Sequence, residues 1–367
     1  MKRTALSVGI GTIALAGLLL TGCSGDGSGG DAGNGGEGGD ALSGTVTLLL
    51  PNTTTTRFIE HDGPAFVAAM GELAPDITVE VVNAEGDAAK QLQQAETAIL
   101  NGSKALVLVS ADPALSGSVL AAADASSVPV IAYEHEALDG PVSYQVIFDP
   151  LKVGQAQGVY FGENLPETDG PVKVARIYGN NGDNYTTKVK EGQDETVDAL
   201  VDSGEVEVVC EDYAAGWDPA NAQQILEQCL TQTGNDIDAV LVSNDGTAAG
   251  AIAALESQQL SGELPVYGGQ DANLDAVRYI LQGLQTSTVF KDYALEGSTA
   301  AELLVSLLSD EEPGDAVNAT FDNGFADIPA AYLDVQSIDA SNVQILIDGG
   351  LYTKEEICDG LTVDFCN

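Results

Sequence analysis

The stretch IDAVLVSNDGTAAGAIAALESQQLSGELPVYGG, residues 237–269, holds the repeating unit that decides the fold. An apolar run at 237–243 predicts a strand, and Asn244 and Asp245 directly after it favour the start of a helix. A second apolar run, LPVYGG at 264–269, predicts the next strand. A strand, a helix and a strand in this order predict parallel strands with the helix covering one face of the sheet.

The same alternation extends upstream of this unit. Segments with helical spacing separate the apolar runs TVTLLL (45–50), ITVEVV (77–82), ALVLV (105–109), VPVIAY (128–133), VKVARIY (172–178) and VEVVC (206–210). One such segment begins after Asp87, a capping residue, and ends at Asn101 and Gly102. With the two runs above, the strands form two series of four, which predicts an α/β fold with two doubly wound parallel-sheet domains.

Polar residues follow most of the predicted strands. In open parallel sheets ligands bind at the carboxyl ends of the strands, so these residues are the candidates for function. They are 52–57, Glu134 and His135, 179–184, Asn244 and Asp245, and Gln270 and Asp271. A role limited to capping the next helix is the alternative for Asn244, Asp245 and Asp271.

The amino-terminal region has the pattern of a secretion signal. An apolar stretch after two basic residues ends in LTGC (20–23), a lipobox, which predicts a lipoprotein signal peptide at 1–22 with lipid on Cys23. The lipid would anchor the protein to the outer face of the cell membrane. Residues 23–44 are rich in Gly, Ser and Asp and predict a flexible tether. A transmembrane helix or an ordinary cleaved signal is the alternative, but spanning a bilayer takes about 20 apolar residues.

The chain is strongly acidic, with 56 Asp and Glu against 13 Lys and Arg and a formal net charge of −43. Such a surface repels phosphate backbones and anionic headgroups. This argues against nucleic-acid binding and against membrane binding through the protein surface itself. Because basic residues are scarce, Arg57 and Lys291, which both lie near strand ends, are notable.

Five cysteines are present, and lipidation of Cys23 leaves an even four in a compartment where disulfides persist. Proximity in sequence favours pairing Cys210 with Cys229 and Cys358 with Cys366, although four cysteines allow three pairings. A zinc site is the alternative. No CxxC pair occurs and neither histidine lies near a cysteine, so we expect no metal.

The sequence lacks the motifs of several common enzyme classes. No GxSxG nucleophile elbow, no GxxxxGK[ST] phosphate loop and no GxGxxG dinucleotide turn follows a predicted strand. A glycosidase needs only two carboxylates, so that reading stays open as an alternative. We expect a binding protein that uses no cofactor, rather than an enzyme.

Residues 216–292 carry four motifs in order: GW-P-NA, SND-T--GAI-AL, GQDA and T-T-(Y/F)K. The stretch resembles the xylose-binding proteins among the type I periplasmic sugar-binding proteins, which serve ABC-type importers. Arg57, AYEH (132–135), FDPLKVG (148–154) and NNGDNYT (180–186) extend the resemblance over 45–350.

The resemblance implies two Rossmann-like lobes joined by a three-segment hinge, with the sugar between them. It implies that the chain crosses from one lobe to the other near 149–150, 291–292 and 323–327. The implied N-terminal lobe is 45–149 with 292–325, and the implied C-terminal lobe is 150–291 with 326–350, before a disulfide-bearing tail at 351–367.

The resemblance also implies a sugar site. A monosaccharide presents hydroxyls at its edge and C–H groups on its faces, which suit charged hydrogen-bonding groups and aromatic rings respectively. Trp217 and Phe58 would cover the ring faces, although Trp217 could instead belong to the core. The implied sugar-binding residues are Arg57, Phe58, Glu134, His135, Asp183, Asn184, Trp217, Asn244, Asp271 and Lys291.

Several positions depart from the family pattern. Glu134 and His135 replace an Asp-Arg pair, which removes a cation with a fixed fork of donors. Tyr185 stands where the family commonly has Asn, and Pro51 and Asn52 replace acidic residues. D-xylose is the first expectation for the sugar, with glucose, galactose and arabinose as alternatives.

The expected partners are a monosaccharide and the membrane permease of an ABC transporter, and the protein is expected to be a monomer. Sugar chemoreception is an alternative role. A LacI-type repressor would need an amino-terminal helix-turn-helix where this chain has a lipobox. A nucleoside- or autoinducer-binding lipoprotein would share the architecture but not the GW-P-NA and GQDA motifs.

Overall fold

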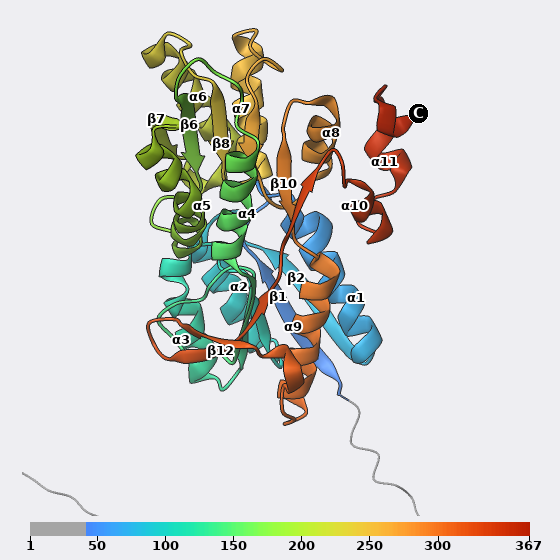
Figure 1. The fold of residues 1–367 in the computed structure, drawn as a ribbon. Coiled ribbons are helices and arrows are strands. Elements are labelled where there is room, and N and C mark those ends of the chain that lie inside the picture. Colours follow the sequence, from blue (N-terminus) through green and yellow to red (C-terminus); the bar gives the residue numbers. More distant parts are fainter. Residues whose placement is uncertain (1–41) are drawn as a thin grey trace, which may run out of the picture. The chain divides into compact units, whose positions relative to one another are not determined.

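The computed structural model describes residues 42–367, and its largest element is a seven-stranded sheet (Figure 1). All strand pairs are parallel except the antiparallel pair at one edge. In spatial order the strands are β11 (Ala319–Asp322), β12 (Asp327–Leu333), β5 (Tyr144–Phe148), β4 (Val130–Tyr133), β3 (Leu106–Leu108), β1 (Gly44–Leu50) and β2 (Ile77–Asn83). We call this sheet and the helices packed on it the N-lobe. The predicted signal peptide and Cys23 lie outside the described residues.

A second sheet has four strands and is parallel throughout. In spatial order its strands are β7 (Val206–Tyr213), β6 (Val172–Tyr178), β8 (Ala239–Val242) and β9 (Val266–Gly268). A separate antiparallel pair consists of β10 (Ser287–Phe290) and β13 (Gln336–Asp339). We call the four-stranded sheet, its helices and this pair the C-lobe. The predicted alternation of strands and helices is confirmed around both sheets.

The helices are assigned to the lobes by the sheet on which they pack (Figure 1). The N-lobe helices are α1 (Gly63–Leu73), α2 (Ala88–Leu100), α3 (Gly117–Ala125) and α9 (Tyr293–Leu308). The C-lobe helices are α4 (Pro150–Glu163), α5 (Asn184–Ser203), α6 (Pro219–Thr233), α7 (Asp245–Ser257) and α8 (Leu274–Gln282), followed by α10 (Gln344–Asp348) and α11 (Lys354–Cys358). Short helical turns are η1 (Phe58–Asp62), η2 (Pro113–Leu115), η3 (Ala215–Trp217), η4 (Gly314–Ala316) and η5 (Asp364–Cys366).

Both faces of each sheet are buried. In β1, Leu48 packs in the apolar cluster that includes α1 and α9, and Leu49 packs in the cluster that includes α2 and α3. In β8, Val240 faces α6 and α7, and Leu241 faces α4 and α5. Successive residues of a strand are therefore both apolar, which explains why these strands appear in the sequence as continuous apolar runs.

Acidic caps fix where the helices begin. Asp87 accepts hydrogen bonds from the first backbone N–H groups of α2, and Asp218 caps α6 with Pro219 at its first position, so both predicted caps are confirmed. Asp149 and Asp292 cap α4 and α9 in the same way. These last two helices begin where the chain passes from one lobe to the other, so the caps also define the ends of two connecting segments.

The third connecting segment lies later in the chain than the resemblance implied. Strand β12 pairs with β5, so the chain leaves the N-lobe sheet after Leu333 and not near 323–327. The region around Asn323 is instead the turn of the β11–β12 hairpin, in which the Asn323 side chain accepts from the backbone N–H groups of Phe325 and Ala326. Residues 326–333, expected in the C-terminal lobe, therefore belong with the N-lobe.

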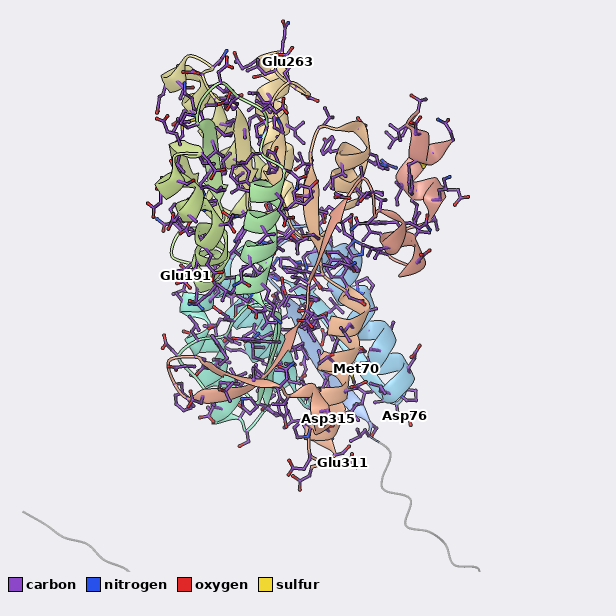
Figure 2. All side chains as sticks on the ribbon, viewed as in Figure 1. Met70, Asp76, Glu191, Glu263, Glu311 and Asp315 are labelled. Carbon is purple, nitrogen blue, oxygen red and sulfur yellow. A yellow bond between two sulfur atoms is a disulfide. The ribbon has the colours of Figure 1, made fainter. Side chains whose placement is uncertain are left out.

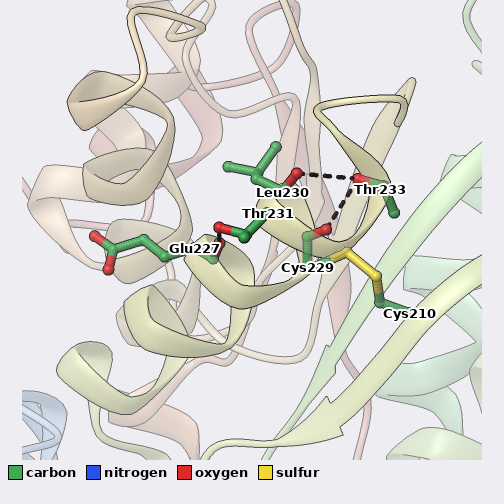
Figure 3. The surroundings of a disulfide bond; sticks show 6 residues. All are labelled: Cys210, Glu227, Cys229, Leu230, Thr231 and Thr233. Atoms are coloured by element: carbon green, nitrogen blue, oxygen red, sulfur yellow. Dashed lines mark hydrogen bonds between the residues drawn. A yellow bond between two sulfur atoms is a disulfide. The ribbon is translucent and has the colours of Figure 1, made fainter.

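Two disulfides are present. Cys210 of β7 is bonded to Cys229 of α6, which ties the edge strand to its covering helix (Figure 3). Cys358 is bonded to Cys366 near the carboxyl terminus. The segment around the second disulfide is not an independent tail, because Tyr352 and Ile357 share an apolar cluster with α8.

The acidic composition appears at the surface. Glu191, Glu263 and Glu311 are exposed and extend into solvent, whereas Met70 is buried (Figure 2). Within residues 42–367, no helix is both long and apolar enough to cross a membrane.

Candidate functional site

A cavity lies between the lobes at the carboxyl ends of the strands. Its empty volume, counting the part that is open to solvent, is about 360 Å³. It is lined by residues that follow β1, β4, β8, β9 and β10, together with two aromatic residues near the starts of α5 and α6. The lining residues are Asn52, Thr55, Arg57, Phe58, Glu134, His135, Tyr185, Trp217, Asn244, Gln270, Asp271 and Lys291.

Arg57 is the most heavily paired residue of the cavity wall and is 1% exposed. Its Nε and Nη2 atoms donate to the two carboxylate oxygens of Asp62 at 2.8 and 2.7 Å, because η1 turns the chain back toward Arg57. Nη2 also donates to Glu296 of α9 at 2.9 Å. Nη1 donates to Glu134 at 2.5 Å and to Asp271 at 3.3 Å. Asp62 and Glu296 thus hold the guanidinium from behind, and Nη1 is directed toward the lining carboxylates.

Lys291 supplies a second buried cation at the end of β10. Its Nζ donates to Oε1 of Glu134 at 2.6 Å and lies 3.3 Å from Oδ1 of Asp271. Nζ also lies 4.9 Å from the centroid of the Tyr185 ring. Glu134 and Asp271 therefore each contact both cations, and the four groups form a compact cluster of alternating charge.

Three groups of the cluster, Glu134, Lys291 and Arg57, remain ionised at neutral pH. Burial favours the neutral acid, but Arg57 and Lys291 outweigh it and lower the pKa of Glu134 to about 2. Burial opposes the charge of Lys291, yet Glu134, Tyr185 and Asp271 raise its pKa above the ordinary value. Burial likewise opposes the charge of Arg57, but Asp62 and Glu134 outweigh this effect and raise its pKa. The cavity therefore offers charged donors and charged acceptors together.

Asp271 sits in an unusual backbone loop. The φ angles of Asp271 and Ala272 are 97° and 51°, a region in which each side-chain-bearing residue costs about 1–3 kcal/mol. Asp245 lies beneath the loop and accepts from the backbone N–H of Asn273 at 2.8 Å and from the hydroxyl of Thr288 at 2.7 Å. Burial and the charge of Asp271 raise the pKa of Asp245 to about 8. These bonds hold the strained loop in place.

Trp217 covers the C-lobe side of the cavity. It lies in η3, is partly buried, and its Nε1 donates to Asp183 at 3.4 Å. Its ring packs directly on the backbone of Gly179, where an added Cβ would lie 2.2 Å from Cζ2 of Trp217. The ring of Tyr185 meets it edge-on at 6.2 Å. Trp217 thus lines the cavity with a partly buried ring that also packs against the apolar cluster around Tyr185.

Phe58 and His135 form the N-lobe side. Phe58 is 2% exposed and its ring meets the imidazole of His135 edge-on at 5.2 Å. The Nδ1 atom of His135 lies 2.7 Å from the backbone oxygen of Ser110, which fixes the ring orientation. Aromatic rings from both lobes therefore line the same cavity as the charged cluster.

The comparisons with known proteins agree with this geometry. Residues 46–312 match the family described as periplasmic binding protein domain. The chain is 32% identical to the D-xylose-binding periplasmic protein of Escherichia coli strain K12, over 81% of this chain and 88% of that protein. It also matches an ABC transporter solute binding protein from Clostridium phytofermentans with bound β-D-glucose, with a TM-score of 0.77 and 29% identity over 86% of this chain and 100% of that chain. The chain belongs to the type I periplasmic sugar-binding proteins of ABC transporters.

Two further matches support this assignment of the sugar-binding protein. The D-xylose-binding periplasmic protein of Haemophilus influenzae is 34% identical, over 76% of this chain and 82% of that protein. A carbohydrate transporter solute binding protein from Chloroflexus aurantiacus, in complex with D-glucose, matches with a TM-score of 0.75 and 26% identity over 86% of this chain and 98% of that chain. The resemblance to xylose-binding proteins and the α/β fold class are confirmed.

Most of the predicted site residues lie together at the cavity. Eight line the cavity: Arg57, Phe58, Glu134, His135, Trp217, Asn244, Asp271 and Lys291. Asn244 also caps α7 through a capping box with Thr247, so its capping role is confirmed, and its role toward a sugar stays a prediction. Asp183 and Asn184 do not line the cavity. Asp183 caps α5 and bonds Trp217, and Asn184 donates to Glu136 of the N-lobe.

Four lining residues were not among the implied sugar-binding residues: Asn52, Thr55, Tyr185 and Gln270. Three of them, Asn52, Thr55 and Gln270, lie in the segments after predicted strands that are the candidates for function. Tyr185 was noted only as a departure from the family pattern, yet its hydroxyl donates to Gln270 at 2.7 Å in the cavity wall.

The family assignment also decides between binding and catalysis. The relatives and structural neighbours of this chain are solute-binding proteins, so the chain is a binding protein and not an enzyme. Among residues 42–367, no group of three or more His, Cys, Asp or Glu side chains is arranged to hold a metal ion.

Proposed function

We propose that this sugar-binding protein captures one monosaccharide, D-xylose in the first instance, between its lobes and delivers it to the membrane permease of an ABC transporter. The observation that carries the proposal is the balanced cluster of Arg57, Lys291, Glu134 and Asp271 in one cavity with Trp217. A neutral sugar hydroxyl both donates and accepts, so it can bond a cation and a carboxylate at once. An ion of either sign would leave half of the cluster opposed to it.

The wall chemistry of the cavity supports a single sugar ring. Trp217 and Phe58 supply apolar faces for the C–H groups of the ring, and the charged cluster supplies partners for its hydroxyls. In this structure the four charged groups bond one another, and we propose that sugar hydroxyls exchange for part of these bonds.

The names and bound ligands of the relatives indicate two candidate sugars. The relatives at 32% and 34% identity are named D-xylose-binding, which places xylose first. The two solved structures at 29% and 26% identity hold D-glucose, which makes glucose the second candidate. His135 stands where the resembling family has Arg, so one charged partner for a hydroxyl is missing and the sugar preference of this chain can differ from that family. Galactose and arabinose complete the set to be tested.

We also propose that the mature protein begins at a lipid-modified Cys23 and is tethered outside the cell membrane as a monomer. The lipobox LTGC (20–23) and the Gly-rich segment after it support the proposal. Replacing Cys23 by Ser should release the protein from the membrane fraction into the medium. Retention in the membrane fraction after this change would contradict lipid anchoring.

A calorimetric titration of the folded protein against D-xylose, D-glucose, D-galactose and L-arabinose tests the proposed ligand class. We expect one-to-one binding of at least one sugar at micromolar or lower concentration, with recovery of the unchanged sugar. Uridine serves as the control for nucleosides, and a negative result for all four sugars with folded protein would contradict the proposal.

A further inference from the structure

Glu136 and Asn184 make a direct side-chain hydrogen bond between the lobes. Glu136 lies in the loop after β4 of the N-lobe, and Asn184 is the first residue of α5 in the C-lobe. The Nδ2 atom of Asn184 donates to Oε1 of Glu136 at 2.6 Å. Neither residue lines the sugar cavity. The bond can form only when the two lobes are close together.

We propose that this hydrogen bond is a latch for the closed form and that burial of Glu136 at the contact between the lobes, beside Asp183, favours its protonated form, so that sugar binding weakens as the pH rises through neutrality. The inference rests on the proposed function, because it assumes that the lobes close around a sugar. It makes Glu136 and Asn184 positioning residues, which act on affinity without touching the ligand.

The surroundings of Glu136 disfavour its negative charge. Glu136 is 3% exposed, and its second oxygen, Oε2, has no hydrogen-bond partner among residues 42–367. Asp183, the cap of α5, adds a carboxylate on the C-lobe side, and its position is fixed by bonds from the backbone of Tyr185 and the indole of Trp217. A buried carboxylate with one neutral donor and a like charge nearby is poorly compensated.

The other charged and titratable groups near Glu136 do not reverse this effect. Lys188 of α5 is the nearby cation, but its Nζ pairs with Glu191 at 2.7 Å and is 44% exposed. From the N-lobe, Tyr332 of β12 faces Glu136 through a hydroxyl that cannot neutralise a carboxylate. His135 is adjacent in the chain and its Nδ1 contacts Ser110 instead. No cation therefore pairs with Glu136 among the described residues.

Burial and then the charge of Asp183 raise the pKa of Glu136 to about 7, although the bond from Asn184 acts in the opposite direction. Opening the lobes would expose Glu136 to water and remove Asp183 from it; both changes return its pKa toward the ordinary value of 4.5 and oppose the smaller effect of losing the bond from Asn184. Closure therefore takes up a proton between these two pH values. The protonated latch favours closure fully below about pH 4.5, and this contribution is lost as the pH rises through about 7.

The cavity charges do not produce the same pH profile. Glu134 has a pKa of about 2 and stays ionised throughout this range. Asp245 titrates near pH 8, but its partners Thr288, Gln285 and Asn273 all lie in the C-lobe, so lobe opening leaves its surroundings in place. Glu134 also has partners in both lobes, but its pKa lies below this pH range, whereas Glu136 combines a two-lobe environment with a pKa inside the range.

The test is a calorimetric titration with D-xylose, and in parallel with D-glucose, at pH 5, 6, 7 and 8. Relative to Glu136→Gln, the wild-type protein should lose about 10- to 100-fold in affinity from pH 5 to pH 8, which follows from a shift between the two pKa values above. The comparison with this variant removes the opposite contribution of His61, which contacts Tyr352 of the C-lobe and whose pKa is lowered to about 4 by burial. Glu136→Gln keeps the acceptor for Asn184 without the charge, so it should bind as the wild type does at pH 5 and lose far less affinity at pH 8. Asn184→Asp places a second carboxylate opposite Glu136 and should steepen the loss.

Glu167→Gln is the matched control, because Glu167 is an exposed acid in the loop between α4 and β6, and it should follow the wild-type profile. A Glu136→Gln variant with the wild-type slope would overturn the latch alone. Absence of sugar binding at every pH would overturn the proposed function and the latch with it.

Discussion

The two walls of the cavity between the lobes are built in different ways. The N-lobe wall presents Arg57, which is fully buried and held from behind by Asp62 and Glu296. The C-lobe wall presents Trp217, which is partly buried and rests on the backbone of Gly179. Removing a group from the first wall leaves buried charges without partners, whereas removing one from the second opens a gap that water can enter. The first wall therefore couples affinity to stability, and the second affects affinity alone.

Arg57→Met should give the largest effect. The change leaves Asp62 and Glu296 buried without their cation, and breaking a buried pair in this way costs about 3–5 kcal/mol of unfolding free energy. Sugar binding should be lost as well. Urea unfolding followed by circular dichroism measures the first effect and calorimetry the second.

Lys152→Met is the control for Arg57→Met. Lys152 also pairs with a carboxylate, Asp334 at 2.6 Å, but its side chain is 50% exposed. Its loss should change the unfolding free energy by at most about 1 kcal/mol. Equal destabilisation by the two variants would remove the proposed difference between buried and exposed pairing.

Asp271→Asn should weaken binding with little effect on stability. The amide keeps the size of the side chain and tolerates a positive φ, but it no longer offers a charged acceptor to two sugar hydroxyls. We expect a loss of about 2–4 kcal/mol, or about 30- to 1000-fold in affinity. Calorimetry and thermal melting of the same sample measure both. Normal binding with a much lower melting temperature would show that Asp271 serves the loop and not the sugar.

Trp217→Ala should have a smaller but clear effect on affinity. Loss of the ring face should weaken sugar binding by at least about tenfold, and Trp217→Phe should weaken it by less. Because Trp217 is only partly buried, the melting temperature should change little. A core residue would behave differently, with a loss of about 3–5 kcal/mol in stability and unaltered affinity per folded molecule.

Gly179→Ala tests the support behind Trp217 and should give the smallest effect. The new Cβ would lie 2.2 Å from the indole, so the ring must shift away from its position. A misplacement worth about 1 kcal/mol weakens binding roughly fivefold. Gly170→Ala is the control, because no atom lies within 4 Å of its added Cβ. Unchanged affinity in Gly179→Ala would mean that the orientation of Trp217 does not matter.

The sequence predicted those parts of the fold and site that depend on local patterns. Continuous apolar runs identified strands buried on both faces, and Asp87 and Asp218 identified helix starts. The residues that follow strands fell at the cavity because parallel strands bring their carboxyl ends to one edge. Strand β5 was missed although YQVIF (144–148) is mostly apolar, since no separate turn or helix signal was recognised before it.

Features that depend on distant residues could not be predicted in the same way. Glu296 lies 239 residues from Arg57, and only the folded chain brings α9 behind the guanidinium. Strand β12 contains Pro329, which disfavours a strand assignment, but the residues that pair with β5 begin only at Ala330. Asn184 lies in a motif of the resembling family, and it was therefore predicted to bind the sugar. Its contact with Glu136 depends on how the two lobes meet, which no local pattern indicates.

Trp217 fluorescence during a D-xylose titration tests the central claim most directly, because Trp217 is the only tryptophan in the chain. If the lobes close on a sugar against this ring, the emission should shift saturably with D-xylose, and uridine should leave it unchanged. The midpoint should agree with the calorimetric affinity. Calorimetric binding of D-xylose with no change in Trp217 emission would contradict the account, because the sugar would then lie outside the cavity between the lobes.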